Sequence, residues 1–404
     1  MPTSMPFSQV KILDFTRYVA GPFATFQFAV LGADVIKVEP LEGDPTRESP
    51  VDKSLAAAKM SPTFFAMNPN KRSIALDLKS PESIPVIHSL IKDIDVLCEN
   101  FRPGVMKNLG LDYDTLKALN PRLIYCSISG FGHSGPEKYT AAFDGKIQAM
   151  SGVMAMNGDP AGGPTRIGFA ACDLIAGMTG AFAISSALYE RANTGQGAFL
   201  DVSMLDSTLV FLSSQVSEAT MSGIQHTQMG NQSVSRKPTG NRFKTGDGDI
   251  VLAVMNEKQF IKLLTTLGRP EALNDPRFAD WATRTEHEKA LRELIETAMS
   301  GHGAAYWEKT LTAADVPCGA IRRVDQIIEH PQLEHRAALQ KVKTFKGEFR
   351  MAAAGFQWQD KAPTIETGAP LLGEHTDEIL LQAGYSAEQI QQLRGKGVLG
   401  PAPA

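Results

Sequence analysis

Short apolar runs alternate with longer mixed segments through the first 130 positions of the chain. Runs dominated by Val, Ile and Leu predict strands at 10–15, 34–40, 72–78, 95–100 and 122–129. The clearest helices between them are 21–33 and 79–94, the latter with Ser80 as its cap and Pro81 in its first turn. Repeated strand–helix–strand order predicts an α/β fold, a doubly wound parallel sheet with helices on both faces. Ligands of such sheets bind at the carboxyl ends of the strands.

The pattern changes after about residue 212. A polar stretch at 213–245, rich in Ser, Gly, Gln and Asn, follows, which is typical of a linker or a loop. Beyond it lie a predicted strand at 249–254, helices between 257 and 311, and a short apolar run at 316–324. This mixture predicts a second, smaller α+β domain.

One predicted helix, at 174–188, consists almost entirely of small and apolar residues, with Gly177 and Gly180 three positions apart. Such a segment is expected to pack closely against other backbone on most of its faces. Asp173 stands at its head. A carboxylate there can cap the helix by accepting hydrogen bonds from its first amides, or it can be a reactive group.

Composition narrows the class of protein. The 404 residues are 43% hydrophobic and 21% charged, as in soluble globular proteins, and the net charge of -4 gives no reason to expect nucleic acid. The four cysteines are scattered, so neither a disulfide framework nor a metal site is expected. Residues 1–10 lack the apolar core of a signal peptide, and no uninterrupted apolar window suggests a membrane span. We therefore expect a cytoplasmic protein that does not bind a membrane.

The loop between the first predicted strand and the first predicted helix does not match a dinucleotide-binding turn. A dinucleotide-binding turn needs GxGxxG so that the pyrophosphate can meet the helix amides. The turn at 16–22, TRYVAGP, has one glycine and a proline, and no Walker A loop is present. Chemistry that depends on bound NAD or ATP is not expected.

A succession of segments carries a family resemblance. "ILDFTRYVAGPFATFQFAVLGADVIKVEPLEGDPTR", "NKRSIALDLKSPE", "ENFRPGVMKNLG", "SISGFGHSGP", "NTGQGAFLDVSMLD" and "LLGEHTDEIL" occur in this order. Together they resemble the class III CoA-transferases, which include formyl-CoA:oxalate and carnitine CoA-transferases and share their fold with α-methylacyl-CoA racemases. The resemblance implies a Rossmann-like large domain (1–205 plus 340–404), a linker (206–229), a small domain (230–325), a return linker (326–339) and an interlocked homodimer.

The resemblance also implies the reaction. Asp173 matches the family's covalent nucleophile, which attacks an acyl-CoA thioester to give a mixed anhydride and then an aspartyl-CoA thioester, from which CoA passes to a small carboxylic acid. The residues suit this role, because Ala170, Ala171 and Gly177 would strip water from the carboxylate while the helix amides keep it ionised.

CoA would be a substrate, and no permanently bound cofactor and no metal is expected. Matching positions place CoA beside Arg17, Val19, Ala20, Leu76, Lys79, Asn100, Phe101 and Arg102. Two positions depart from the family. Asn108 stands where an Arg is common, so Lys107 is expected to supply that charge, and Pro40 replaces a basic residue that contacts the adenine in formyl-CoA transferases.

Phe143 separates the transferases from the racemases. Racemases read Gly-His-Asp where this chain reads Ala142-Phe143-Asp144, and Phe143 cannot act as a base. Asp144 is either an acid that orients the thioester or a cap for the helix that follows it. A racemase and a non-catalytic acyl-CoA-binding protein are the alternatives to a transferase.

The acid substrate is harder to predict. The sequence GNQSVSRKPTGNRFK stands where oxalate enzymes carry a run of glycines, so oxalate is not expected. Arg166, Arg236, Lys237 and Arg242 are candidates to bind a second carboxylate. The expected substrate is a small dicarboxylate or a related anionic acid, with succinyl-CoA as the donor.

Overall fold

The computed structural model describes residues 5–344, 347–359 and 363–401. Contacts within the chain divide it into two compact units. The larger contains Met1–Gly152, Ile167–Ile224 and Pro331–Ala404, and the smaller contains Val153–Arg166 and Gln225–His330.

These bounds differ from the sequence-based ones at three places. The predicted return linker 326–339 contains α17 (Pro331–His335), which belongs to the larger unit. Residues 153–166 group with the smaller unit. The segment 206–229, which we interpret from sequence as a linker, instead begins in helices α10 (Met204–Phe211) and α11 (Ser213–Ser222). Helix α10 forms there because the Ser203 hydroxyl caps it by accepting from the Asp206 amide, and it packs against α7 and α9.

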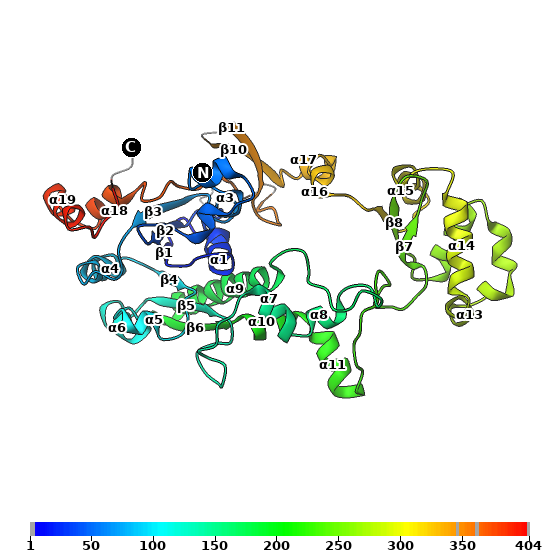
Figure 1. Ribbon diagram of the computed structural model, residues 1–404, viewed down its shortest axis with the longest axis horizontal. Helices are drawn as coiled ribbons and strands as arrows, with labels where there is room; N and C mark the ends of the chain where they lie inside the picture. Colours follow the sequence, from blue (N-terminus) through cyan, green and yellow to red (C-terminus); the bar gives the residue numbers. More distant parts are fainter. Residues whose placement is uncertain (1–4, 345–346, 360–362, 402–404) are drawn as a thin grey trace. The chain divides into compact units, whose positions relative to one another are not determined.

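A six-stranded sheet forms the centre of the larger unit (Figure 1). Its strands run in the order β3-β2-β1-β4-β5-β6, and every neighbouring pair is parallel. This confirms the predicted doubly wound parallel sheet. The strands are β1 (Lys11–Asp14), β2 (Asp34–Glu39), β3 (Lys71–Ala75), β4 (Val96–Glu99), β5 (Ile124–Ser129) and β6 (Ala198–Ser203).

Helices cover both faces of this sheet, because alternate strand residues point to opposite sides. Ile12, Val96 and Cys126 pack with α1 (Ala20–Ala29), α7 (Asp144–Met150) and α9 (Ala171–Thr194). Their neighbours Leu13, Leu97 and Tyr125 pack with helices on the other face. These are α4 (Ser83–Ile91), α5 (Val105–Asn108), α6 (Tyr113–Leu119), α18 (Thr376–Gln382) and α19 (Ala387–Gly395).

Two details of these elements depart from the predictions. Helix α4 begins at Ser83 rather than near 80, because the chain first makes a turn in which the Ser83 amide donates to the Ser80 carbonyl. Helix α9 is longer than predicted and packs closely on one side only. A Cβ on Gly177 would lie 2.6 Å from the Ala20 carbonyl oxygen, whereas Phe182 on the opposite side is 75% exposed.

By length and composition alone, α9 is apolar enough to cross a membrane. It is also the helix that packs along α1 and β5, and the core helix of a soluble protein passes the same test. The test is therefore weak evidence for a membrane span.

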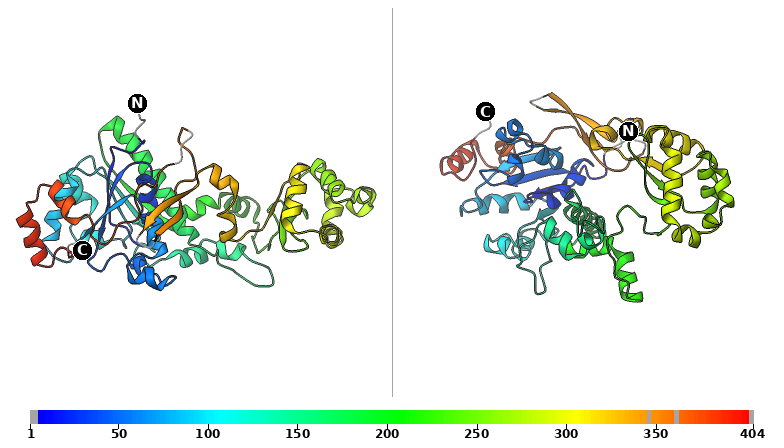
Figure 2. Two further views of the ribbon diagram at one scale, coloured as in Figure 1. Left: turned by 90° about the horizontal axis from the view of Figure 1, so that it is seen from above. Right: turned by 45° about the vertical axis from the view of Figure 1, so that its right-hand side comes forward.

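The C-terminal segment, red in Figures 1 and 2, returns to the β3 edge of the sheet. Leu399 forms a bridge with Leu76, and α18 packs on β3. The remaining elements of the unit are η1 (Pro45–Glu48), α2 (Lys53–Ala57), α3 (Pro62–Met67), α17 (Pro331–His335), β10 (Leu339–Thr344) and β11 (Gly347–Ala352).

The smaller unit has its own apolar core around Phe243, Phe260 and Leu291. Its three strands form an antiparallel sheet in the order β7-β8-β9. Its elements are α8 (Val153–Met156), β7 (Gly240–Lys244), β8 (Asp249–Ala253), α12 (Glu257–Thr266), η2 (Pro270–Asn274), η3 (Pro276–Phe278), α13 (Trp281–Glu286), α14 (Glu288–Met299), α15 (Ala304–Ala313), β9 (Cys318–Ala320) and α16 (Val324–Ile327).

Candidate active site

A pocket of about 180 Å³ opens at the carboxyl end of the central strands, beside the first turn of α9. The loops after β1, β4 and β5 surround it, as expected for a doubly wound sheet. Its lining includes Asp173 together with Tyr18, Val19, Ala20, Asn100, Phe101, Arg102, Lys138, Phe143 and Met204. Asp173 and five of the residues that the resemblance assigns to CoA are thus brought together.

Asp173 is the third residue of α9, and its side chain does not cap the helix. The N-cap is Ala170, whose methyl side chain cannot form a hydrogen bond with the helix amides. Within the described ranges, no group donates a hydrogen bond to the Asp173 carboxylate. Burial, and the nearby charge of Asp144, raise the pKa of Asp173 from its usual value to about 7. The carboxyl group is poorly solvated and free of partners, which suits a nucleophile.

Asp144 supplies the carboxylate that α9 needs at its first turn. Its Oδ1 accepts from the Cys172 amide at 2.8 Å and from the Asp173 amide at 3.4 Å. Its Oδ2 accepts from Gln148 Nε2 at 2.6 Å. The other interpretation, in which Asp144 caps the helix that follows it, is wrong, because Phe143 is the N-cap of α7 and makes no side-chain cap bond. Asp144 therefore fixes the backbone from which Asp173 projects.

Two loops that face Asp173 are tied together. Asn100 Oδ1 accepts from the Arg17 amide at 2.8 Å, and its Nδ2 donates to the Arg17 carbonyl at 2.7 Å. The Arg17 guanidinium lies 5.1 Å from the centre of the Phe101 ring. Tyr18, next along the chain, has a φ of 65°, an unusual conformation for a residue other than glycine, and its ring meets Phe143 edge-on at 5.5 Å.

Buried charges behind the first loop hold it in place. Lys37 Nζ donates to the Thr16 carbonyl at 2.7 Å and pairs with Asp44 at 3.1 Å. Asp14 pairs with Lys71 at 3.0 Å, and although burial opposes its ionisation, Lys71 and Lys37 hold the pKa of Asp14 below its usual value. The sequence interpretation missed this network. Its signal was Lys37 inside one apolar strand and Lys71 at the start of another, since a charge buried there needs a partner.

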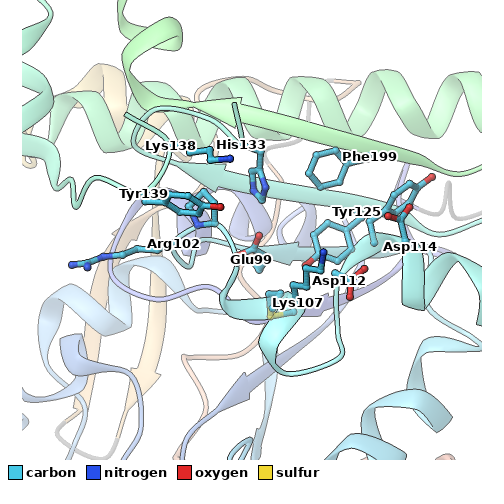
Figure 3. A pocket seen from close by; sticks show the side chains of 14 residues that line it. Glu99, Arg102, Lys107, Asp112, Asp114, Tyr125, His133, Lys138, Tyr139 and Phe199 are labelled. Atoms are coloured by element: carbon cyan, nitrogen blue, oxygen red, sulfur yellow. The ribbon is translucent and has the colours of Figure 1, made fainter. Parts of the chain in front are cut away.

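A second pocket, of about 370 Å³, is lined by residues of β4, β5, β6, α5 and α6 and shares Arg102, Pro103 and Lys138 with the first (Figure 3). Lys107 also lines it. Among the described residues, the side chains of Arg102 and Lys107 have no carboxylate partner, so both cations are available to an anionic ligand. His133 and Glu99 lie at its centre in Figure 3.

Four residues assigned to CoA by resemblance line neither pocket, and one of them, Arg17, is held by its backbone to Asn100 in the lining of the first. Leu76 is fully buried in the core of the larger unit. Lys79 is exposed in the turn after β3, where its amide donates to Asp77 at 3.0 Å. Asn108 is exposed at the end of α5.

The candidate carboxylate-binding residues all belong to the smaller unit. Arg242 pairs with Asp249 at 3.1 Å in its own hairpin. Lys237 donates to the Met255 carbonyl and lies 4.3 Å from the centre of the Trp281 ring. The other two candidate residues for binding a carboxylate are Arg166 and Arg236, which also belong to the smaller unit. Over the part of the chain that the structure describes, no cluster of three His, Cys, Asp or Glu residues is arranged to hold a metal ion.

Comparison with known proteins gives matches over most of the chain. The family model described as CoA-transferase family III matches residues 7–376. The chain is 34% identical over 387 residues to the succinate–glutarate CoA-transferase of Agrobacterium fabrum, covering 93% of this chain and 95% of that protein. It is 39% identical over 341 residues to the acetyl-CoA:oxalate CoA-transferase of Acetobacter aceti, covering 83% of this chain and 86% of that protein. Among solved structures, a CAIB/BAIF family protein from Brucella suis has a TM-score of 0.84 at 34% identity, covering 94% of this chain and 100% of that one.

Proposed function

Because the chain belongs to CoA-transferase family III, we propose that Asp173 is the group on which it carries out CoA transfer. The protein is an enzyme that moves CoA from an acyl-CoA to a carboxylic acid. The observation that carries the assignment is a half-buried carboxyl group that accepts no hydrogen bond from any residue the structure describes, located in a pocket lined by the loops that the family resemblance assigns to CoA.

The proposed reaction divides one exchange between two acids into separate acyl transfers. The Asp173 carboxylate attacks the thioester carbonyl of the donor, and CoA leaves as its thiolate, which gives a mixed anhydride. The thiolate then attacks the aspartyl carbonyl, releases the donor acid and forms an aspartyl-CoA thioester. The acceptor carboxylate attacks this thioester, which forms a second anhydride and frees the thiolate. The thiolate finally attacks the acceptor's carbonyl, so that acyl-CoA leaves and Asp173 is regenerated.

The surroundings of Asp173 favour this sequence. Burial removes water that would stabilise the carboxylate and hydrolyse the anhydride. The dipole of α9 favours negative charge at its N-terminus, where the aspartyl carbonyl lies, although the first four amides of the helix already donate to Phe169, Asp144 and Ala170. Asp144 accepts from the Cys172 and Asp173 amides and so sets the direction in which Asp173 points. In this account Asp144 is a positioning residue.

Succinyl-CoA is the proposed donor and a small dicarboxylate is the proposed acceptor. Several relatives are named for succinyl-CoA or succinate with glutarate, citramalate or mesaconate as the second acid. Others are named for oxalate. Arg166, Arg236, Lys237 and Arg242 are the cations proposed to meet the second carboxylate.

The test is a matrix of acyl-CoA donors against free acids, with the products identified by mass spectrometry. Succinyl-CoA with glutarate or another four- to five-carbon dicarboxylate is expected to give the fastest exchange, and Asp173→Asn to give none. An active Asp173→Asn protein would overturn the assignment of the nucleophile. Fast exchange with oxalate alone would overturn the substrate.

We also propose a homodimer. Helix α9 exposes Met178, Phe182 and Tyr189, and the next two helices expose Phe211 and Met221. Large apolar side chains gathered on one stretch of chain are typical of an interface between copies. The family resemblance adds that the two chains interlock.

A further inference from the structure

Three polar side chains form a row across the sheet beside the second pocket. Glu99 on β4 is the register partner of Ser127 on β5, and Ser127 is the partner of Asp201 on β6. Glu99 and Ser127 are almost completely buried, and the nearby Ser127 hydroxyl lowers the pKa of the Glu99 carboxyl. The mechanism proposed above uses none of the three.

His133 lies over this row. Its Nε2 is 2.7 Å from Ser127 Oγ, and its backbone amide donates to Asp201 Oδ2 at 2.9 Å. Its ring meets Phe199 edge-on at 5.3 Å. Burial lowers the pKa of His133, so the ring is neutral at neutral pH. Figure 3 shows His133 and Glu99 at the centre of the pocket.

Glu99, Ser127 and His133 can exist with one proton more or one fewer, because the Ser127 hydroxyl can turn its proton toward either neighbour. When Glu99 is ionised, Ser127 donates to it and accepts from the protonated Nε2 of His133. When Glu99 carries a proton, it donates to Ser127, which donates to a bare Nε2, and the imidazole proton lies on Nδ1. The two forms differ by one proton, and the ring stays neutral in both.

Glu99 also fixes the loop that follows β4. Its Oε2 accepts from the Phe101 amide at 2.7 Å, between Asn100, which is tied to Arg17, and Arg102, which lines both pockets. Burial raises the pKa of Glu99 to about 7, the charge of Asp201 adds to the effect, and the bonds from Ser127 and Phe101 oppose it. The site is thus close to its protonation midpoint before any ligand binds.

We propose that Glu99, Ser127 and His133 take up a proton when a CoA thioester binds beside the loop Asn100–Pro103, and that Glu99 is a positioning residue for that loop. The proposal rests on the proposed function, since it requires CoA to bind there.

The charges brought by CoA determine whether Glu99 gains or loses a proton when CoA binds. The CoA phosphates bring several negative charges to a pocket that already holds Asp112 and Asp114 from α6 and lies beside Asp201. They also neutralise the cations Arg102, Lys107 and Lys138 at its edge. Both changes disfavour the ionised form of a nearby carboxyl group.

Titration calorimetry of CoA into the full-length protein tests this, at about pH 7.5 in two buffers of different ionisation enthalpy. Wild type is expected to take up roughly half a proton per CoA more than Glu99→Gln. Asp93→Asn, which removes an exposed carboxylate that does not line the pocket, is expected to match wild type. Any titration of CoA itself is common to all three proteins, so the difference reports on Glu99.

Equal proton uptake by wild type and Glu99→Gln would overturn the inference while leaving the proposed function standing. Absence of CoA binding to wild type would overturn the proposed function first. If Glu99→Gln does not fold, Ser127→Ala provides the second test, because it separates Glu99 from His133. It is expected to move the midpoint of the pH dependence of the CoA Kd, and an unchanged midpoint would contradict the proposal.

Discussion

Asp173 has a carboxyl group that burial and Asp144 hold near its protonation midpoint at neutral pH. Only the ionised form can attack a thioester, so the rate of the first acyl transfer is expected to rise about tenfold per pH unit below pH 7 and to level off above it. Rapid-mixing measurement of CoA release in a single turnover checks this. A rate that is flat, or that falls with rising pH, would contradict the role assigned to Asp173.

The same pKa shift has a consequence for stability. The pKa of about 7 in the folded protein lies above the usual 3.8, so the folded state retains a proton that the unfolded chain releases between these values. Wild-type stability therefore falls as pH rises through this window. Asn cannot ionise, so the stability of Asp173→Asn relative to wild type is expected to increase by roughly 2–3 kcal/mol between about pH 5 and pH 8. Urea unfolding at both pH values measures it, and a variant less stable than wild type at pH 8 would indicate a capping role instead.

Sequence analysis could identify those candidate site residues that stand out from their immediate neighbours in the chain. Asp173 stands out as a carboxylate before a run of small residues, and Asn100 and Arg102 follow a buried strand directly. Leu76 could not be judged in this way, since only the return of residue 399 to β3 shows that it is enclosed. The bonds from Asp144 to the start of α9 join positions nearly thirty residues apart, and no local pattern reveals them.

Among the elements, the contact between α9 and α1 places Asp173 against the first CoA loop. A Cβ on Gly177 would lie 2.6 Å from the Ala20 carbonyl oxygen. Gly177→Ala is therefore expected to destabilise the fold by about 1–3 kcal/mol, although Ala favours helix, and to reduce turnover. Ser186→Ala, at an exposed position of the same helix, is the control and is expected to retain wild-type stability and turnover. Thermal unfolding and steady-state rates check this, and a fully active, stable Gly177→Ala would contradict it.

Strands were the elements that the sequence predicted best. Runs of Val, Ile and Leu predict all five of the first strands, because a parallel sheet buried on both faces requires apolar residues on each. Helix starts were less predictable. The Ser80–Pro81 pair looks like a cap, but it belongs to a turn that precedes α4. The predicted linker 206–229 instead contains most of α10 and all of α11.

At the scale of the whole molecule, the exposed apolar side of α9 bears on assembly. If two chains interlock around it, the dimer cannot separate without unfolding, and it is expected to persist on dilution to nanomolar concentration. Light scattering and mass photometry measure this. Phe182→Glu combined with Tyr189→Glu places charges on that side and is expected to prevent assembly. A protein that dissociates reversibly on dilution would contradict interlocking but not the chemistry.

The exact boundaries of the two units could not be predicted from the sequence. The two-part composition is visible along the chain, but the assignment of 153–166 to the smaller unit depends on contacts with residues far away in sequence, such as the bond between the Gly230 amide and the Gly158 carbonyl. The homodimer and the cytoplasmic location stay predictions.

The central claim is that CoA transfer passes through an acyl group on Asp173. The most direct test supplies donor acyl-CoA without acceptor, traps the protein with borohydride, and maps the modified peptide by mass spectrometry. Reduction of the aspartyl-CoA thioester is expected to convert the side chain of Asp173 to an alcohol, in the peptide that also contains Cys172, and to leave Asp173→Asn unchanged. A reduced carboxyl group at any other residue, or none in a protein that still turns over, would contradict the account.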